Sequence, residues 1–214
     1  MCFSAPVSFG AAAVLGVIGV AILANAKRMT DLPLAAVPLL YAAQQTIEGL
    51  LWRTVSDGRD HSLWLATLFA AIALIIWPLL IPLAIALVER DMSRRLAMLI
   101  FLPAGIGVAV NYAGTIIAHP YRAWPVGQTL TYVNNHPISP VMLGLYVVCV
   151  CIPPLLSSSR TLQLFGVIVI AGLGISFIAF YESFISVWCF FAALASATIW
   201  MFFRTRGPLA ANTG

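Results

Sequence analysis

Seven stretches of about 20 mostly apolar residues constrain the fold of this chain more than any other feature. A helix needs roughly 20 such residues to cross a hydrocarbon core about 30 Å thick. Hydrophobic residues make up 62% of the 214 residues and charged residues 8%, which excludes an ordinary soluble domain. The runs are too long and too uniformly apolar for barrel strands. The sequence therefore predicts an all-α polytopic membrane protein, a bundle of seven transmembrane helices at 7–26, 33–52, 63–88, 96–118, 138–157, 161–181 and 184–203.

Basic residues between these stretches predict the direction of the bundle. Eight of the eleven Lys and Arg residues fall on one side: Lys27, Arg28, Arg90, Arg94, Arg95, Arg160, Arg204 and Arg206. Because the basic side is usually cytoplasmic, we expect the N-terminus outside and the C-terminus inside. Topology then explains the net charge of +4, and no nucleic-acid partner is expected. The predicted organisation is one domain over 1–206 and a short cytoplasmic tail at 207–214, in the cytoplasmic (inner) membrane of a bacterium.

The first stretch could be a signal peptide instead of a helix of the bundle. No positive charge precedes it, however, and Lys27 and Arg28 follow it directly. These flanks are the reverse of those of a signal peptide. We therefore expect 7–26 to be the first transmembrane helix.

Residues 44–52, QQTIEGLLW, place an acid in an otherwise apolar segment. Gln45, Glu48 and Trp52 share one helix face, and Gln44 lies one turn before Glu48. Acids within membrane segments are costly and usually functional, although a protonated glutamic acid that only packs helices together is an alternative. With the predicted direction, Glu48 lies near the outer end of the second helix, and other polar or aromatic residues lie at a similar depth. The sequence predicts an outward-facing pocket lined by Gln44, Gln45, Glu48, Trp52, Asn111, Tyr112, Glu182, Trp188 and Cys189.

The imidazole and carboxylate side chains near the outer ends of the helices are ligand types that bind zinc, iron or copper. The candidate ligands of such a divalent transition metal are Glu48, His119, His136, Glu182 and Cys2. No two of them are spaced to share one helix face, and each histidine, His61 included, could equally be a solvated side chain. Cys2 has three alternatives: a plain packing role, a disulfide with Cys189, or metal binding after removal of Met1. Cys149 and Cys151 are expected to pack as small hydrophobes.

The long connection at 119–137, HPYRAWPVGQTLTYVNNHP, is expected to cover the pocket as a lid. Its aromatic residues are typical of a membrane interface. Prolines inside the predicted helices, among them Pro78 and Pro103, remove backbone donors and are expected to bend the helices apart.

Four motifs give the chain a family resemblance: the opening MCFSAPVSFG, QQTIEGLLW, the WP pair at 77–78, and FISVWCFFAALAS at 184–196. Together they resemble an uncharacterised family of small bacterial multi-span membrane proteins, and the match covers nearly the whole chain. The family has no established activity. The resemblance implies that the family-pattern residues are Cys2, Gln44, Gln45, Glu48, Trp52, Trp188 and Cys189.

A looser resemblance is to the seven-helix metal hydrolase superfamily that includes alkaline ceramidases and adiponectin-receptor-type proteins. Helix number and direction agree. The histidine pair in the seventh helix of that superfamily is missing here, because 184–203 contains no histidine. This common architecture does not carry a function to the chain.

The sequence thus predicts an integral membrane protein that binds a metal ion or a small ligand at its outer face, as a sensor or accessory protein. A metal-dependent hydrolase acting on a lipid or amphiphile is one alternative, and a small-solute transporter is another. The expected partners are the lipid bilayer and an unknown small ligand or lipid. A retinal Schiff base is excluded because 184–203 contains no lysine, and no nucleotide-binding motif is present.

Overall fold

The computed structural model describes residues 4–56, 62–137 and 139–205, most of which are helical. Cys2, Arg59, His61, Arg206 and the predicted tail lie outside these residues. The α-helices are α1 (Ala5–Asn25), α2 (Leu32–Ser56), α3 (Ser62–Ala71), α4 (Trp77–Val88), α5 (Met92–Leu99), α6 (Phe101–Ala118), α7 (Pro140–Leu156), α8 (Arg160–Ala179) and α9 (Phe184–Thr205). The shorter elements are the 3-10 turns η1 (Met29–Asp31) and η3 (Tyr181–Ser183), the π-helical turn η2 (Ile72–Ile76), and the strands β1 (Arg122–Val126) and β2 (Thr129–Val133).

Among the described residues, five helical segments are long and apolar enough to cross a membrane. They are Ala5–Asn25, Leu63–Val88, Met92–Ala118, Arg160–Ala179 and Tyr181–Thr205. Two of them combine neighbouring elements, because α3, η2 and α4 form one rod and α5 and α6 form another. The polar residues of QQTIEGLLW make α2 less apolar, and α7 has only 17 residues. The all-α prediction is confirmed, and the chain is a multi-pass membrane protein.

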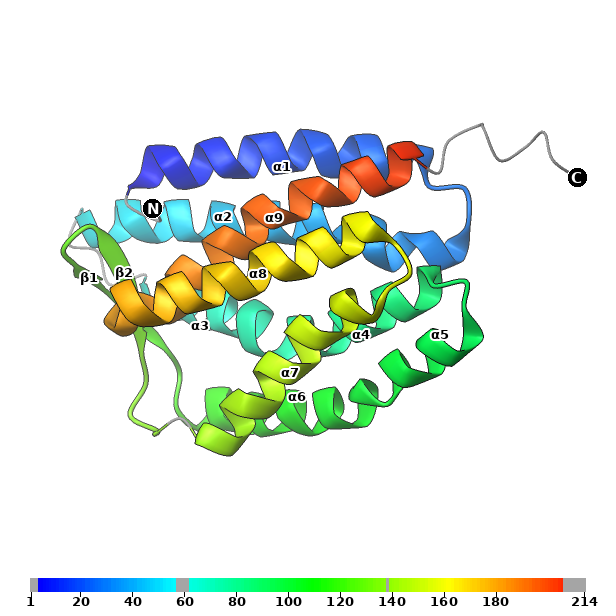
Figure 1. Ribbon diagram of the computed structural model, residues 1–214. Coiled ribbons are helices and arrows are strands. Elements are labelled where there is room, and N and C mark those ends of the chain that lie inside the picture. Colours follow the sequence, from blue (N-terminus) through cyan, green and yellow to red (C-terminus); the bar gives the residue numbers. More distant parts are fainter. Residues whose placement is uncertain (1–3, 57–61, 138, 206–214) are drawn as a thin grey trace, which may run out of the picture.

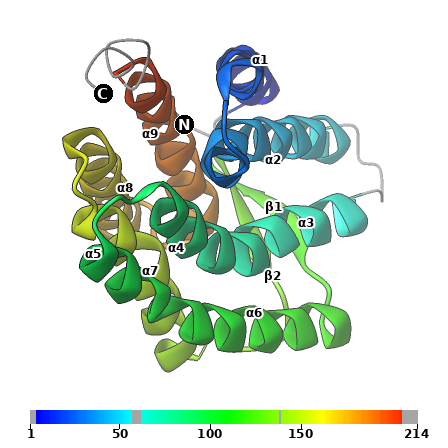
Figure 2. The same cartoon turned by 90° about the vertical axis from the view of Figure 1, so that its right-hand side faces the viewer.

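The helices run side by side between two ends of an elongated bundle (Figure 1). The N-terminus of α1, the C-terminus of α2 and the hairpin of β1 and β2 lie at one end, here called the hairpin end. The C-terminus of α4, α5 and the C-terminus of α9 lie at the other. Along the bundle, α4 occupies a central place and packs on α2, α5, α6 and α7 (Figure 2).

The rod of α3, η2 and α4 is irregular just before its first proline. Pro78 has no backbone N–H, and the π-helical turn η2 ends two residues earlier, at Ile76. The Tyr146 hydroxyl of α7 donates a hydrogen bond of 2.6 Å to the Ala73 carbonyl oxygen within this turn. On the other side, a Cβ on Gly105 of α6 would overlap the Pro78 carbonyl oxygen. Pro78 therefore interrupts the backbone hydrogen bonds of the helix here, and α6 and α7 pack closely against the irregular turn.

The predicted lid is an antiparallel hairpin. Its turn depends on Gly127, whose φ of +58° suits a tight hairpin turn between Val126 and Thr129. Leu130 and Tyr132 of β2 are buried, and the Tyr132 ring stacks on Phe69 of α3 with ring centroids 4.3 Å apart. The hairpin contacts α2, α3 and α9. It therefore caps the hairpin end of the bundle.

Candidate functional site

Glu48 lies fully buried where α2 packs against α9. The Ser186 hydroxyl of α9 donates a hydrogen bond of 2.5 Å to Glu48 Oε1. Gln45 Nε2 donates one of 3.3 Å to Glu48 Oε2, as the i, i+3 spacing on one helix face allows. The apolar surroundings make polar neighbours essential for such an acid, and they are supplied by α9 and by the preceding turn of α2 itself.

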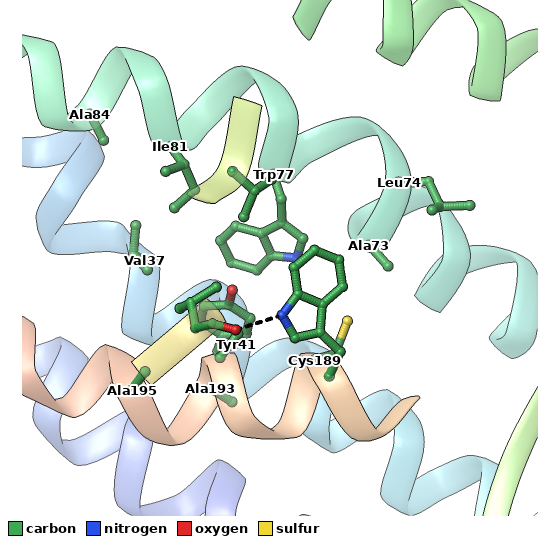
Figure 3. Close-up of a cluster of buried hydrophobic side chains, with 14 of the residues drawn as sticks. Val37, Tyr41, Ala73, Leu74, Trp77, Ile81, Ala84, Cys189, Ala193 and Ala195 are labelled. Atoms are coloured by element: carbon green, nitrogen blue, oxygen red, sulfur yellow. Dashed lines mark hydrogen bonds between the residues drawn. The ribbon is translucent and has the colours of Figure 1, made fainter. Parts of the chain in front are cut away.

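Gln44, one turn before Glu48, connects the same region to the central rod. Trp77 Nε1 donates a hydrogen bond of 3.1 Å to Gln44 Oε1. The Trp77 ring stacks on Tyr41 of α2 with centroids 3.9 Å apart, and both belong to the same buried cluster as Cys189 of α9 (Figure 3). The Cys189 thiol lies beside Gln44 and Glu48. We call Gln44, Gln45, Glu48, Ser186 and Cys189 the Glu48 cluster.

Some hydrogen-bonding capacity of the cluster and its surroundings is not used among the residues that the structure describes. There, Gln45 Oε1 and Ser8 Oγ of α1 are buried without a hydrogen-bond partner, and Gln44 Nε2 is buried with only the Cys189 thiol beside it. Ser8 belongs at this level, because α1 and α2 are antiparallel and Gly49 lies against the Phe9 ring. One amide donor, one amide acceptor and one hydroxyl are therefore available near Glu48.

The other predicted pocket residues fall into a buried or half-buried group and an exposed group. Trp188 is buried next to Cys189, and its indole N–H donates to the Val169 carbonyl oxygen of α8 at 3.0 Å. Tyr112 is buried against Tyr146, and Trp52 is half-buried at the end of α2. Asn111 and Glu182, by contrast, are exposed, because Asn111 lies on the outer side of α6 and Glu182 lies in the η3 turn.

The candidate metal ligands are not assembled either. Among residues 4–56, 62–137 and 139–205, no group of three or more His, Cys, Asp or Glu side chains could hold a metal ion. His119 and His136 do lie together, with ring centroids 5.5 Å apart, but both are exposed at the base of the hairpin. Glu48 is buried inside the helix bundle, whereas His119, His136 and Glu182 are exposed. The structure therefore does not support one metal site made of these four residues.

Sequence reasoning missed Ser186 as the partner of Glu48 and Trp77 as the partner of Gln44. A signal for Ser186 was present, since Ser186, Cys189 and Ala193 share one face of α9. For Trp77 the one signal was its place in the WP motif of the family resemblance, which did not indicate Gln44 as its partner. Its indole reaches Gln44 only because the rod of α3, η2 and α4 packs against α2.

Sequence reasoning also missed a second buried carboxylate, Glu89, which caps the C-terminus of α4 at the far end of the bundle. Its oxygens accept hydrogen bonds from the hydroxyls of Ser157 and Ser158 and from the backbone N–H groups of Arg90, Asp91 and Ser158, at 2.6 to 3.2 Å. Burial raises the pKa of this carboxyl, but the hydrogen bonds outweigh burial and lower the pKa to about 2. Glu89 therefore ties the α4–α5 turn to the α7–α8 turn.

Comparison with known families agrees with the resemblance carried by the motifs. Residues 1–213 match the model of a family of unknown function, DUF6629, and the chain belongs to that family. No curated protein and no solved structure matches the chain. The predicted membership of an uncharacterised family is confirmed, and the Glu48 cluster must be interpreted from its own chemistry.

Proposed function

We propose that this member of a family of unknown function binds a small polar ligand at the Glu48 cluster, as a membrane-embedded sensor or accessory protein. One observation carries the proposal: Gln44 Nε2, Gln45 Oε1 and Ser8 Oγ are buried around an acid and make no hydrogen bond with the described part of the chain. Unpaired polar groups inside a membrane protein are costly, so their presence together favours a ligand that pairs with them.

The chemistry of the cluster suggests the chemistry of its ligand. An amide donor, an amide acceptor and a hydroxyl suit a small molecule that has both donors and acceptors, such as an amino acid, an amide or a polyol. The π-helical turn beside Trp77 supports a functional reading, since such turns are frequent at functional sites. A small ligand is favoured over a metal because the described residues offer no group of three metal ligands.

The proposal includes the predicted topology. All seven stretches, α2 and α7 among them, cross the cytoplasmic membrane of a bacterium, with the N-terminus outside and the tail at 207–214 inside. The basic residues on the side of Lys27 and Arg204 support this direction. The Glu48 cluster and the hairpin then lie toward the outer side.

Hydrolysis and transport have less support. A metal-dependent hydrolase needs a ligand set that the described residues do not assemble. In a transporter, ionisable groups usually mark the path through the membrane. The cluster that contains Glu48 lies toward one end of the bundle, and Glu89, at the opposite end, is already bonded to five donors.

Thermal unfolding of the purified full chain in detergent, with a panel of amino acids, amides, polyols and divalent metals, tests the proposal. We expect at least one polar organic solute to raise the Tm of the wild-type protein and to have little effect on Glu48→Gln. Glu182→Gln is the matched control, because it removes an exposed carboxylate at the same end. Equal responses of Glu48→Gln and wild type to every solute would contradict the proposal.

A further inference from the structure

A second candidate site lies at the base of the hairpin, apart from the Glu48 cluster. A pocket of about 300 Å³ opens there, lined by His119, Pro120, Arg122, Asn134 and Asn135 and by Leu63 of α3, among others. This volume is at the lower end of the roughly 300–1,000 Å³ typical of small-molecule sites. The pocket is therefore large enough for a small group but not for a large cofactor.

The lining of this pocket is rich in hydrogen-bond donors. The Arg122 guanidinium makes no hydrogen bond or ion pair within the described part of the chain. Asn134 Nδ2 is buried and makes no well-formed hydrogen bond with the described residues, although the Tyr121 hydroxyl lies near it. The His119 ring lines the pocket and the His136 ring lies 5.5 Å from it. An imidazole offers at least one N–H donor in either protonation state.

The charge of the lining is one-sided. None of the described lining residues is acidic, whereas Arg122 is a permanent cation. Two histidines with no third ligand near them among the described residues make a weak metal site, but the same groups beside an arginine make a good site for an oxyanion. The donors and the single cation fit a phosphate group.

The position of the hairpin adds a further constraint. Trp124 of β1 is exposed, as are Val126 and Val133, so the hairpin presents an aromatic and apolar surface beside the pocket. Tryptophan favours the membrane interface, at the level of the lipid headgroups. We propose that the hairpin pocket binds a phosphate group, through Arg122, His119 and Asn134, with His136 at its edge. An anionic lipid headgroup and free phosphate share this chemistry.

The test uses the purified full chain in detergent and two probes. Inorganic phosphate is titrated by calorimetry, and retention of phosphatidic acid over phosphatidylcholine is measured by native mass spectrometry. We expect Arg122→Gln to weaken binding of at least one probe about tenfold or more, since it removes a charge-assisted hydrogen bond. His119→Gln is expected to weaken the same probe. Arg53→Gln, the control, removes an exposed arginine at the same end and should change neither.

The two probes separate the sources of the phosphate. Arg122-dependent retention of phosphatidic acid with no binding of inorganic phosphate identifies a lipid headgroup, and the reverse identifies a soluble phosphate. If Arg122→Gln unfolds, Asn134→Leu provides the same comparison without a change of charge. No binding of either probe, or binding that neither Arg122→Gln nor His119→Gln affects, overturns the proposal. Zinc binding lost in His119→Gln, with phosphate unaffected by Arg122→Gln, would assign the histidines to a metal instead.

Discussion

Two buried carboxylates, Glu48 and Glu89, lie toward opposite ends of the bundle and differ in how their surroundings use hydrogen bonds. Around Glu89, two serine hydroxyls and three backbone N–H groups all point at the carboxylate. Around Glu48, Ser186 and Gln45 donate to the carboxylate, but the amides of Gln44 and Gln45 keep one unpaired atom each. The Glu89 site is complete within the protein, whereas the Glu48 cluster is not.

This difference separates a structural acid from a candidate binding acid. A carboxylate surrounded by donors stabilises the fold and has no capacity left for another molecule. A cluster with unpaired donors and acceptors pays for them in stability unless a ligand pairs with them. Mutations at the two sites should therefore differ in kind: at Glu89 they should change stability, and at the Glu48 cluster they should change ligand response more than stability.

The largest effect is expected for Glu89→Gln. The amide keeps the size of the side chain, but its NH₂ group would face the donors that now bond to the carboxylate. We expect a loss of about 3 kcal/mol in the free energy of unfolding, because hydrogen bonds to a charged group are worth more than neutral ones. Unfolding by denaturant in detergent measures it. A loss as small as that of the exposed control Glu182→Gln would remove the contrast between the two sites.

The stabilisation by Glu89 should also depend on pH. Its pKa is lowered in the folded protein to about 2, against an ordinary value of 4.5. The contribution is therefore complete above about pH 4.5 and is lost as the pH falls toward 2, by about 3 kcal/mol in all. Thermal unfolding of wild type and Glu89→Gln between pH 2 and 7 checks this. Parallel pH curves for the two proteins would contradict the assignment.

A smaller effect is expected for Ser186→Ala. The change removes the donor to Glu48 Oε1 without removing the buried carboxyl group. Leaving a buried acceptor with one partner fewer should cost about 2 kcal/mol in the free energy of unfolding. Ser196→Ala, on the same helix, is the matched control, because its hydroxyl donates only within its own turn to Ala193. Equal losses in the two variants would indicate that the hydrogen bond to Glu48 contributes little.

The smallest effects on stability are expected at Glu48 and Gln44. In Glu48→Gln, rotation of the Gln45 amide can turn its unpaired Oε1 toward the new NH₂ group, so we expect a loss of only about 1 kcal/mol. Gln44→Leu removes the acceptor of Trp77 but also an unpaired amide donor, and should cost less than about 1 kcal/mol. Denaturant unfolding measures both. A loss at Glu48→Gln as large as at Glu89→Gln would make Glu48 a structural acid.

The helical elements could be predicted from the sequence because each depends mainly on a local property, the length of an apolar run. The prediction at 63–88, for example, coincides with the observed segment Leu63–Val88, although η2 interrupts it. The hairpin was expected only as a lid. The alternating apolar residues Leu130 and Tyr132 are typical of a strand. Pro125 argues against the opposite strand, because proline is unusual within strands.

The sites were harder to predict because their partners come from distant parts of the chain. Ser186 is 138 residues from Glu48, and Ser157 is 68 residues from Glu89. The level of a residue along the bundle could be predicted from the order of the helices, but the direction of its side chain around the helix could not. Asn111 and Glu182 were therefore assigned to the same level as Glu48, yet they are exposed on other faces.

The hairpin is also attached to the start of α9. The Ser183 hydroxyl forms hydrogen bonds with the hydroxyls of Thr129 and Thr131 of β2, at 2.6 and 2.9 Å. Ser183 ends the η3 turn, and Ser186 follows three residues later, within one turn of helix. A displacement of the hairpin would therefore be transmitted to the first turn of α9 by these hydrogen bonds. The hairpin and the geometry around Glu48 are thereby connected through Ser183, three residues before Ser186.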